Sequence, residues 1–115
     1  MPAAMFASRL RSATRRERTQ RQRDSFADRL TQTGVELETV ARVESLIERL
    51  SLAGTRITID TATFRDAVVV VVRMQDHARS LDARQEALLR EHTTTWSSAG
   101  GKDGRTVCFE MPRRI

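Results

Sequence analysis

The sequence has very little of the residue types that mark several common protein classes. It contains one cysteine, Cys108, and no tyrosine among its 115 residues. One cysteine forms no internal disulfide and supplies no zinc site that needs several thiolates. No apolar run approaches the ~20 residues that a membrane-spanning helix requires. These absences exclude a disulfide framework, a cysteine-based zinc site and a transmembrane helix, and a chain of this length is expected to form one small domain.

Proline and lysine are also scarce. The only prolines are Pro2 and Pro112, so no proline interrupts the backbone between them and long helices are permitted. Lys102 is the only lysine, and arginine therefore supplies 19 of the 20 positive charges. Lysine, asparagine and tyrosine share AT-rich codons, so their scarcity indicates a GC-rich genome. The preference for arginine is for this reason weak evidence of phosphate binding.

The positive charges are unevenly distributed along the chain. Residues 1–30 hold eight arginines against three acidic residues, whereas residues 31–115 hold twelve basic and twelve acidic residues. The whole net charge of +5 thus comes from the first quarter of the chain. We therefore divide the sequence into a basic arm, residues 1–24, and a single small domain, residues 25–115.

Three interpretations of the basic arm stay open. In the first, its arginines neutralise the phosphates of a nucleic acid. In the second, residues 1–23 are a mitochondrial presequence, which is typically rich in arginine and poor in acidic residues. In the third, the arm is a helix that docks on an acidic protein. The candidate anion or nucleic-acid contacts are Arg15, Arg16, Arg18, Arg21 and Arg23. A cytoplasmic location is expected, and a mitochondrial one is the alternative under the second interpretation.

Residues 25–53 are predicted to form one long helix. Ser25 and Asp28 have the spacing of an N-terminal capping box. Gly34 costs about 1 kcal/mol relative to alanine within a helix, so the pattern allows a break there. Gly54 is placed to end the helix. The apolar residues recur at steps of three and four and include Val40, Val43, Ile47 and Leu50.

Two patterns compete over residues 61–92, which follow a short predicted strand at 55–59. Five β-branched residues in succession, 68–72, favour a strand. Steps of three and four residues favour a second long helix instead. Its seam would consist of Phe64, Val71, Met74, Leu81 and Leu88. We predict the helix because the periodicity continues beyond the valines. The alternative is an α+β fold with a strand at 67–74 and a helix from residue 76.

The C-terminal segment, residues 93–111, is predicted to form a β-hairpin. A glycine-rich stretch at 100–104 provides the turn, and Val107 and Phe109 alternate with less apolar neighbours on the following strand. A hairpin alone is marginally stable, so its apolar side chains are expected to pack against the rest of the domain.

The sequence offers no candidate catalytic or metal site. His77 and His92 would lie roughly 22 Å apart on one helix, too far to share a metal ion. Glu44 and Glu48 are best interpreted as part of a solvated, salt-bridged helix face. Cys108 has no evident base to activate it, and motifs for phosphate loops, nucleophile elbows and calcium loops are absent. We expect a protein that is not an enzyme and that binds no cofactor and no metal.

These observations predict a mostly α fold. It would be a long antiparallel helical hairpin with a coiled-coil seam, a basic N-terminal arm and a small C-terminal β-hairpin. Two helices bury only one stripe each and leave Leu46, Val68 and Val72 off the seam, so self-association or a protein partner is expected. The predicted function is a non-enzymatic structural or interaction subunit of a larger assembly. The alternative is a nucleic-acid-binding protein whose arm contacts phosphates without sequence specificity.

Overall fold

The computed structural model describes residues 25–52, 56–75 and 80–113. This part of the chain is an α+β domain, so the predicted helical hairpin and coiled coil are wrong. Residues 25–32 are helical. The further elements, in chain order, are α2 (Leu37–Leu50), β1 (Arg56–Thr63), β2 (Ala67–Gln75), α3 (Ala83–His92), β3 (Thr95–Gly100) and β4 (Gly104–Pro112).

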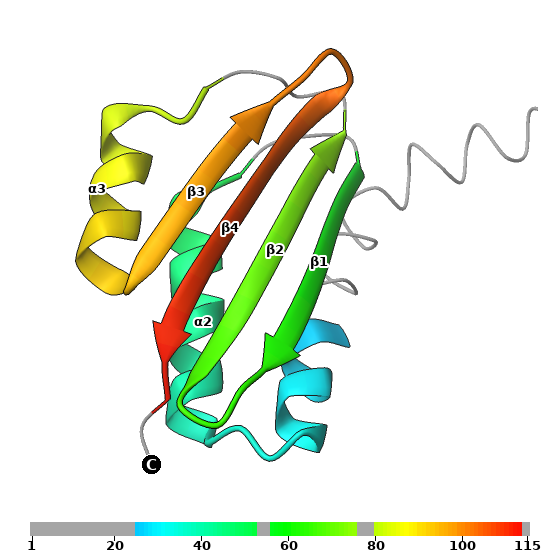
Figure 1. Ribbon diagram of the computed structural model, residues 1–115, viewed down its shortest axis with the longest axis vertical. Coiled ribbons are helices and arrows are strands. Elements are labelled where there is room, and N and C mark those ends of the chain that lie inside the picture. The colour runs from blue at the N-terminus through cyan, green and yellow to red at the C-terminus, as the bar shows by residue number, and fades with distance from the viewer. Residues whose placement is uncertain (1–24, 53–55, 76–79, 114–115) are drawn as a thin grey trace, which may run out of the picture.

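The strands form one antiparallel sheet, with α2 and helical residues 25–32 behind it in the view of Figure 1. The strand order is β1-β2-β4-β3, and every neighbouring pair is antiparallel. Two hairpins, β1–β2 and β3–β4, are therefore joined through α3 and meet along β2 and β4. The domain has two layers, a sheet and a set of helices, and we call the two sides of the sheet the covered face and the open face.

The helix expected at 25–53 is two helices, because the chain breaks at Gly34. This glycine has a φ of 84°, a left-handed conformation in which side chains are strained. The Gly34 N–H donates to the carbonyl of Thr31, and the Val35 N–H donates to that of Leu30. Together these bonds form a Schellman motif, which ends the first helix. The second helix, α2, ends at Leu50 and is capped by Ser51, not by the predicted Gly54, which lies outside the described residues.

The helix expected at 61–92 does not form, and the alternative with a strand at 67–74 is the correct one. That segment contains the end of β1, all of β2 and, after residues outside the described part, α3. Residues 67–72 are all apolar, so they match a period of two as well as a period of 3.5. Where periodicity cannot discriminate, the χ1 stiffness of valine decides, and it favours a strand.

The C-terminal segment forms a hairpin from β3 and β4, as the alternation of residues predicts. It contributes half of a four-stranded sheet and is not a small appendage to helices. Gly104 begins β4 opposite Gln75. A Cβ atom at Gly104 would lie 2.2 Å from the carbonyl oxygen of Met74, so only glycine fits where β4 begins beside β2.

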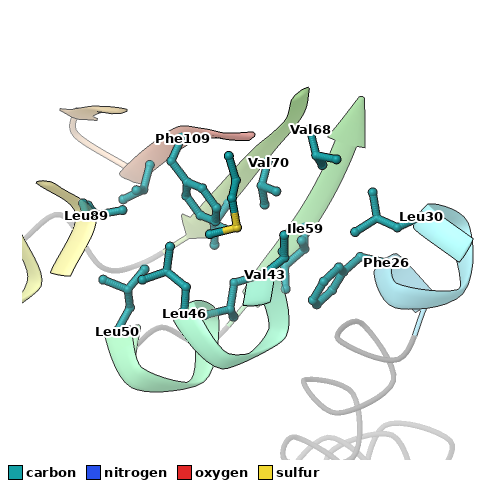
Figure 2. Packing of buried hydrophobic residues seen from close by; sticks show 14 of the residues in the cluster. Phe26, Leu30, Val43, Leu46, Leu50, Ile59, Val68, Val70, Leu89 and Phe109 are labelled. Carbon is teal, nitrogen blue, oxygen red and sulfur yellow. The ribbon is translucent and has the colours of Figure 1, made fainter. Parts of the chain in front are cut away.

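The hydrophobic core fills the space between the covered face and the helices, as Figure 2 shows. Val43, Leu46 and Leu50 of α2 point toward the sheet, flanked on one side by residues 25–32 and on the other by α3. Apart from Ala67 at the start of β2, the buried strand side chains lie at alternate positions; they are Ile59, Val68, Val70, Val72, Met74, Val107, Phe109 and Met111. Leucine and valine side chains of this kind each stabilise the fold by about 1.5–3 kcal/mol when fully buried.

Side chains at the start of α3 donate hydrogen bonds to free carbonyl groups at the end of α2. Arg84 and Gln85 donate to the carbonyls of Arg49 and Leu50 at 2.8 and 2.9 Å, carbonyls that have no partner within their own helix. A reciprocal capping box between Asp82 and Gln85 starts α3. The two helices are thus fixed to one another end to side, which holds α3 against the core beside β3.

Candidate functional site

The open face of the sheet is the side that no described helix covers. Side chains that pair across the strands point to the same side of the sheet, so the register identifies the members of this face. One row consists of Asp60, Val71, Cys108 and Ser97. The rows on either side are Ala62, Val69, Glu110 and Thr95, and Thr58, Arg73, Thr106 and Ala99. We call these twelve residues, with Arg56 at the start of β1, the open face.

The centre of the open face is apolar. Val69, Val71 and Cys108 lie on the two middle strands and are partly exposed. A shallow hollow of about 260 Å³ lies over this region, and it is lined by Val69, Thr95, Trp96, Ser97, Cys108, Phe109 and Glu110. The solvated face of an antiparallel sheet is usually polar. Within the described part of the chain no layer covers this apolar centre, which makes the face a candidate binding surface.

The charges of the open face are separated along the strands. Arg56 and Arg73 occupy one end, and Asp60 and Glu110 occupy the other half. Arg73 also forms an ion pair with Asp60 across β1 and β2. Both side chains of that pair are about half exposed, so the pair contributes at most about 1 kcal/mol to stability. Arginine therefore occupies one end of the face, whereas the carboxylates lie in the same rows as the apolar residues, Asp60 beside Val71 and Glu110 beside Val69.

The open face contains no aromatic residue at its strand positions. Trp96 pairs with Phe109 and packs against the core on the covered side. Proteins that bind single-stranded nucleic acid on a sheet use aromatic side chains on which the bases stack. The small side chains of this face, mostly alanine, valine, serine and threonine, instead form a flat surface suited to contact with another polypeptide.

A second exposed apolar surface lies at the end of the molecule where β1 turns into β2. Leu37 and Phe64 are the large hydrophobic residues that the structure leaves exposed, at 76% and 54%. Arg113 donates to the carbonyls of Phe64 at 2.9 Å and Gly34 at 3.0 Å, which ties the turn between β1 and β2 to the segment before α2. It also forms an ion pair with Glu36 at 3.0 Å.

The Glu36–Arg113 pair changes the titration of the carboxylate. Arg113 donates to both carboxylate oxygens, and this hydrogen bonding is the main reason that the pKa of Glu36 lies below its ordinary value. Thr39 adds a weaker hydrogen bond in the same direction. The pair joins the end of β4 to the start of α2 and serves the fold.

A third surface is a groove of about 290 Å³ beside α2, near the C-terminal end of α3. Arg42, Arg49 and His92 surround it, above a floor that includes Leu46 and Met111. Arg49 lies 3.2 Å from the Nε2 atom of His92, and Arg42 donates to the carbonyl of Pro112. The groove is basic along its rim, and its arginines are already held by contacts within the domain.

The predicted site residues do not lie together in the structure. The five arginines of the arm lie outside the described residues. Val40, Val43, Ile47, Leu50, Met74 and Leu88 are buried, and Leu81 packs against the core. Val71 lies on the open face, and Phe64 is exposed. The buried members belong to a core between a sheet and helices, so the predicted seam between two long helices is wrong.

The residues expected to remain off the seam are buried as well. Leu46, Val68 and Val72 are at most 3% exposed and belong to the core. They provide no argument for self-association, so any association has to be argued from the open face. The members of that face were not predicted as a group, because residues 61–92 were assigned to a helix. The run of five valines at 68–72 could have indicated this face, because a strand with this sequence is apolar on both sides.

The residues considered as metal ligands do not converge. His77 lies outside the described part, and Glu44 and Glu48 are exposed on α2. Within residues 25–52, 56–75 and 80–113, no group of three or more histidine, cysteine, aspartate or glutamate side chains is arranged to hold a metal ion. Over the same residues, no helix combines the length and apolarity needed to cross a bilayer.

Comparisons with known proteins do not identify a function for this chain. No family model, curated protein or solved structure matches this chain. A function for this protein is therefore inferred from the surfaces just described, among them the open face with its apolar centre.

Proposed function

We propose that this protein is a non-enzymatic interaction subunit that binds another polypeptide through the open face of its sheet. The observation that supports this proposal is the composition of β2. Its residues Val68 to Val72 are apolar on both sides, a pattern typical of strands that are covered on both faces. The helices cover one side only among the described residues. A partner would supply the second cover.

The shape of the open face also favours a polypeptide partner. Apart from Arg56, Arg73 and Glu110 its side chains are short, so a second layer can pack over most of the face at about 10 Å, the usual distance between packed sheets. The outer rows add hydroxyl groups and both signs of charge around the apolar centre. A polar rim around an apolar centre is the ordinary anatomy of a protein–protein interface.

The occupancy of the open face can be measured with Cys108, the only cysteine in the chain. The full chain is treated with a thiol-alkylating reagent in extract of its own cells and again after purification and dilution. The control is a Cys108→Ser variant carrying Ala87→Cys on the exposed side of α3. We expect Cys108 to react several-fold more slowly in the extract, relative to the control position. Equal relative rates in the two samples would contradict the proposal.

Nucleic-acid binding is the second candidate function, and the division of charge favours it. The described residues carry eleven basic and twelve acidic side chains, a net charge of −1, whereas residues 1–24 carry +5. Phosphate contacts supply affinity without sequence information. In this candidate, the arginines Arg15, Arg16, Arg18, Arg21 and Arg23 neutralise about five phosphates.

Salt dependence tests this second candidate. With about five phosphates neutralised, log K plotted against log salt on duplex DNA should have a slope on the order of −4 to −5. Replacement of the five arginines by glutamine should abolish the binding, and little sequence preference is expected. If the unaltered chain does not bind duplex or single-stranded nucleic acid at physiological salt, or if the variant binds equally well, this function is excluded.

A further inference from the structure

We infer that the start of the basic arm, residues 5–13, occupies the open face of its own chain when no partner is bound. This inference rests on the proposed function and adds regulation to it, because the arm and the partner polypeptide then compete for one surface. Three observations support it. They are an apolar stripe in the arm, the place where the arm joins the domain, and the charges beside the apolar centre of the face.

The first half of the arm contains an apolar stripe with helical spacing. Phe6, Leu10 and Ala13 follow one another at steps of four and three residues, which places them on one side of a helix. A helix of nine residues is marginally stable alone in water, so it needs a surface to pack against. Val69 and Val71, in turn, lack a covering layer among the described residues. The same chain therefore contains an apolar stripe and an apolar surface that can cover one another.

The arm joins the domain beside an edge of the sheet. Helical residues 25–32 flank β1, and Arg29 donates to the backbone carbonyl of Ile59 on that strand. Because β1 is an edge strand, the arm reaches the open face by passing round it. Residues 14–24 link the stripe to the helix and span about 36 Å when extended. A layer on the open face lies about 20 Å from the helix layer, two spacings of about 10 Å, so this link is long enough.

The charges beside the apolar centre favour a basic occupant. The two rows that contain this centre hold two charged residues, Asp60 and Glu110, and both are acidic. Asp60 pairs with Arg73, whereas Glu110 forms no ion pair with any described residue. Residues 5–13 contain two arginines and no acidic residue. The segment that carries the apolar stripe therefore also carries the charge that complements Glu110.

The connection within one chain makes a weak contact sufficient. Two binding elements joined by a short linker meet at an effective concentration in the millimolar range. A contact too weak to hold two separate molecules together can therefore keep the arm on its own domain. A partner that binds the open face more tightly than this displaces the arm.

A second cysteine tests the contact directly, because Cys108 is the only cysteine in the chain. Leu10→Cys places a thiol in the middle of the stripe, and mild oxidation of the dilute, purified full chain should join it to Cys108. Ser12→Cys is the matched control, since it has nearly the same link to the domain but lies on the opposite side of the helix. We expect the disulfide of Leu10→Cys to form at least tenfold faster, within one chain, as measured on non-reducing gels.

The alkylation rate of Cys108 gives a second measurement on the purified full chain. A variant with both Phe6→Asp and Leu10→Asp places two charges in the stripe, and its Cys108 should react several-fold faster than that of the unaltered chain. A variant with both Ser8→Asp and Ser12→Asp makes the same change of charge on the other side of the helix and should leave the rate unchanged. Circular dichroism confirms that the domain of each variant is folded.

Equal disulfide rates for Leu10→Cys and Ser12→Cys would overturn the inference, as would equal alkylation rates in the two aspartate variants. Disulfides that form mainly between chains would also overturn it. The proposed function is judged separately in cell extract, where Cys108 of the Phe6→Asp, Leu10→Asp variant should still be protected by the partner. Loss of protection there, with a fast Leu10→Cys disulfide, would contradict the proposed function and leave the docked arm in place.

Discussion

The two faces of the sheet are built from the same residue type yet have different surroundings. Along β2, Val68, Val70 and Val72 are fully buried under the helices, whereas Val69 and Val71 on the opposite side are partly exposed. Residue type alone does not distinguish them. What distinguishes them is the register with β1 and β4, which places every second side chain beneath α2. The covered face provides stability, and the proposed function assigns association to the open face.

The largest expected difference between the faces is at two adjacent residues of β4. Phe109 is 1% exposed on the covered face, and Phe109→Ala should lower the free energy of unfolding by about 3–5 kcal/mol, because it leaves a cavity in the core. Cys108→Ala on the open face should change it by less than about 1 kcal/mol. Urea unfolding of dilute protein measures both values. Equal effects at the two positions would show that the faces are assigned wrongly.

A hydroxyl group placed on β2 gives a finer comparison. Val70→Thr replaces a buried methyl group by a hydroxyl of similar size, which should cost about 1–3 kcal/mol because the hydroxyl is removed from water. Val71→Thr makes the same change on the open face and should stay within about 0.5 kcal/mol of the unaltered chain. If Val71→Thr is the more damaging of the two, the register of β2 is contradicted.

Lowering the pH should destabilise the fold by a smaller amount than the core substitutions do. The pKa of Glu36 is lower in the folded chain than in the unfolded chain, so its pair with Arg113 stabilises the fold at neutral pH. This contribution is fully present above the unfolded pKa, near 4.5, and is lost as the pH falls through the lower folded pKa. The urea midpoint of the unaltered chain should therefore fall more steeply below about pH 5 than that of Glu36→Gln. Parallel curves would rule out a role for the pair in stability.

Part of the fold was predictable from local signals. Gly34 was recognised as a place where the helix could break, and the alternation of Val107 and Phe109 predicted the C-terminal hairpin. The strand β2 was assigned wrongly because its unbroken apolar run satisfies every period. A periodic pattern carries information only where polar residues alternate with apolar ones. For β2, the choice between helix and strand therefore has to be made from side-chain propensity.

The candidate site could not be predicted from local sequence patterns. Asp60, Val71, Ser97 and Cys108 come from four strands and meet only because the strand order places β4 between β2 and β3. No spacing in the sequence encodes that neighbourhood. The apolar character of both sides of β2 was the one available sign that a second surface needed a cover.

The most direct test of the division between stability and association is Val71→Arg, measured by alkylation of Cys108 in cell extract and by urea unfolding. Val71 lies in the same row of the open face as Cys108, so a long charged side chain there should keep a partner polypeptide off the face. We predict that Cys108 loses its protection in the extract, while the unfolding free energy of the purified protein changes by less than about 1 kcal/mol. Cys108 that stays protected in the variant, or a protein that is strongly destabilised, would contradict the assignment of association to the open face.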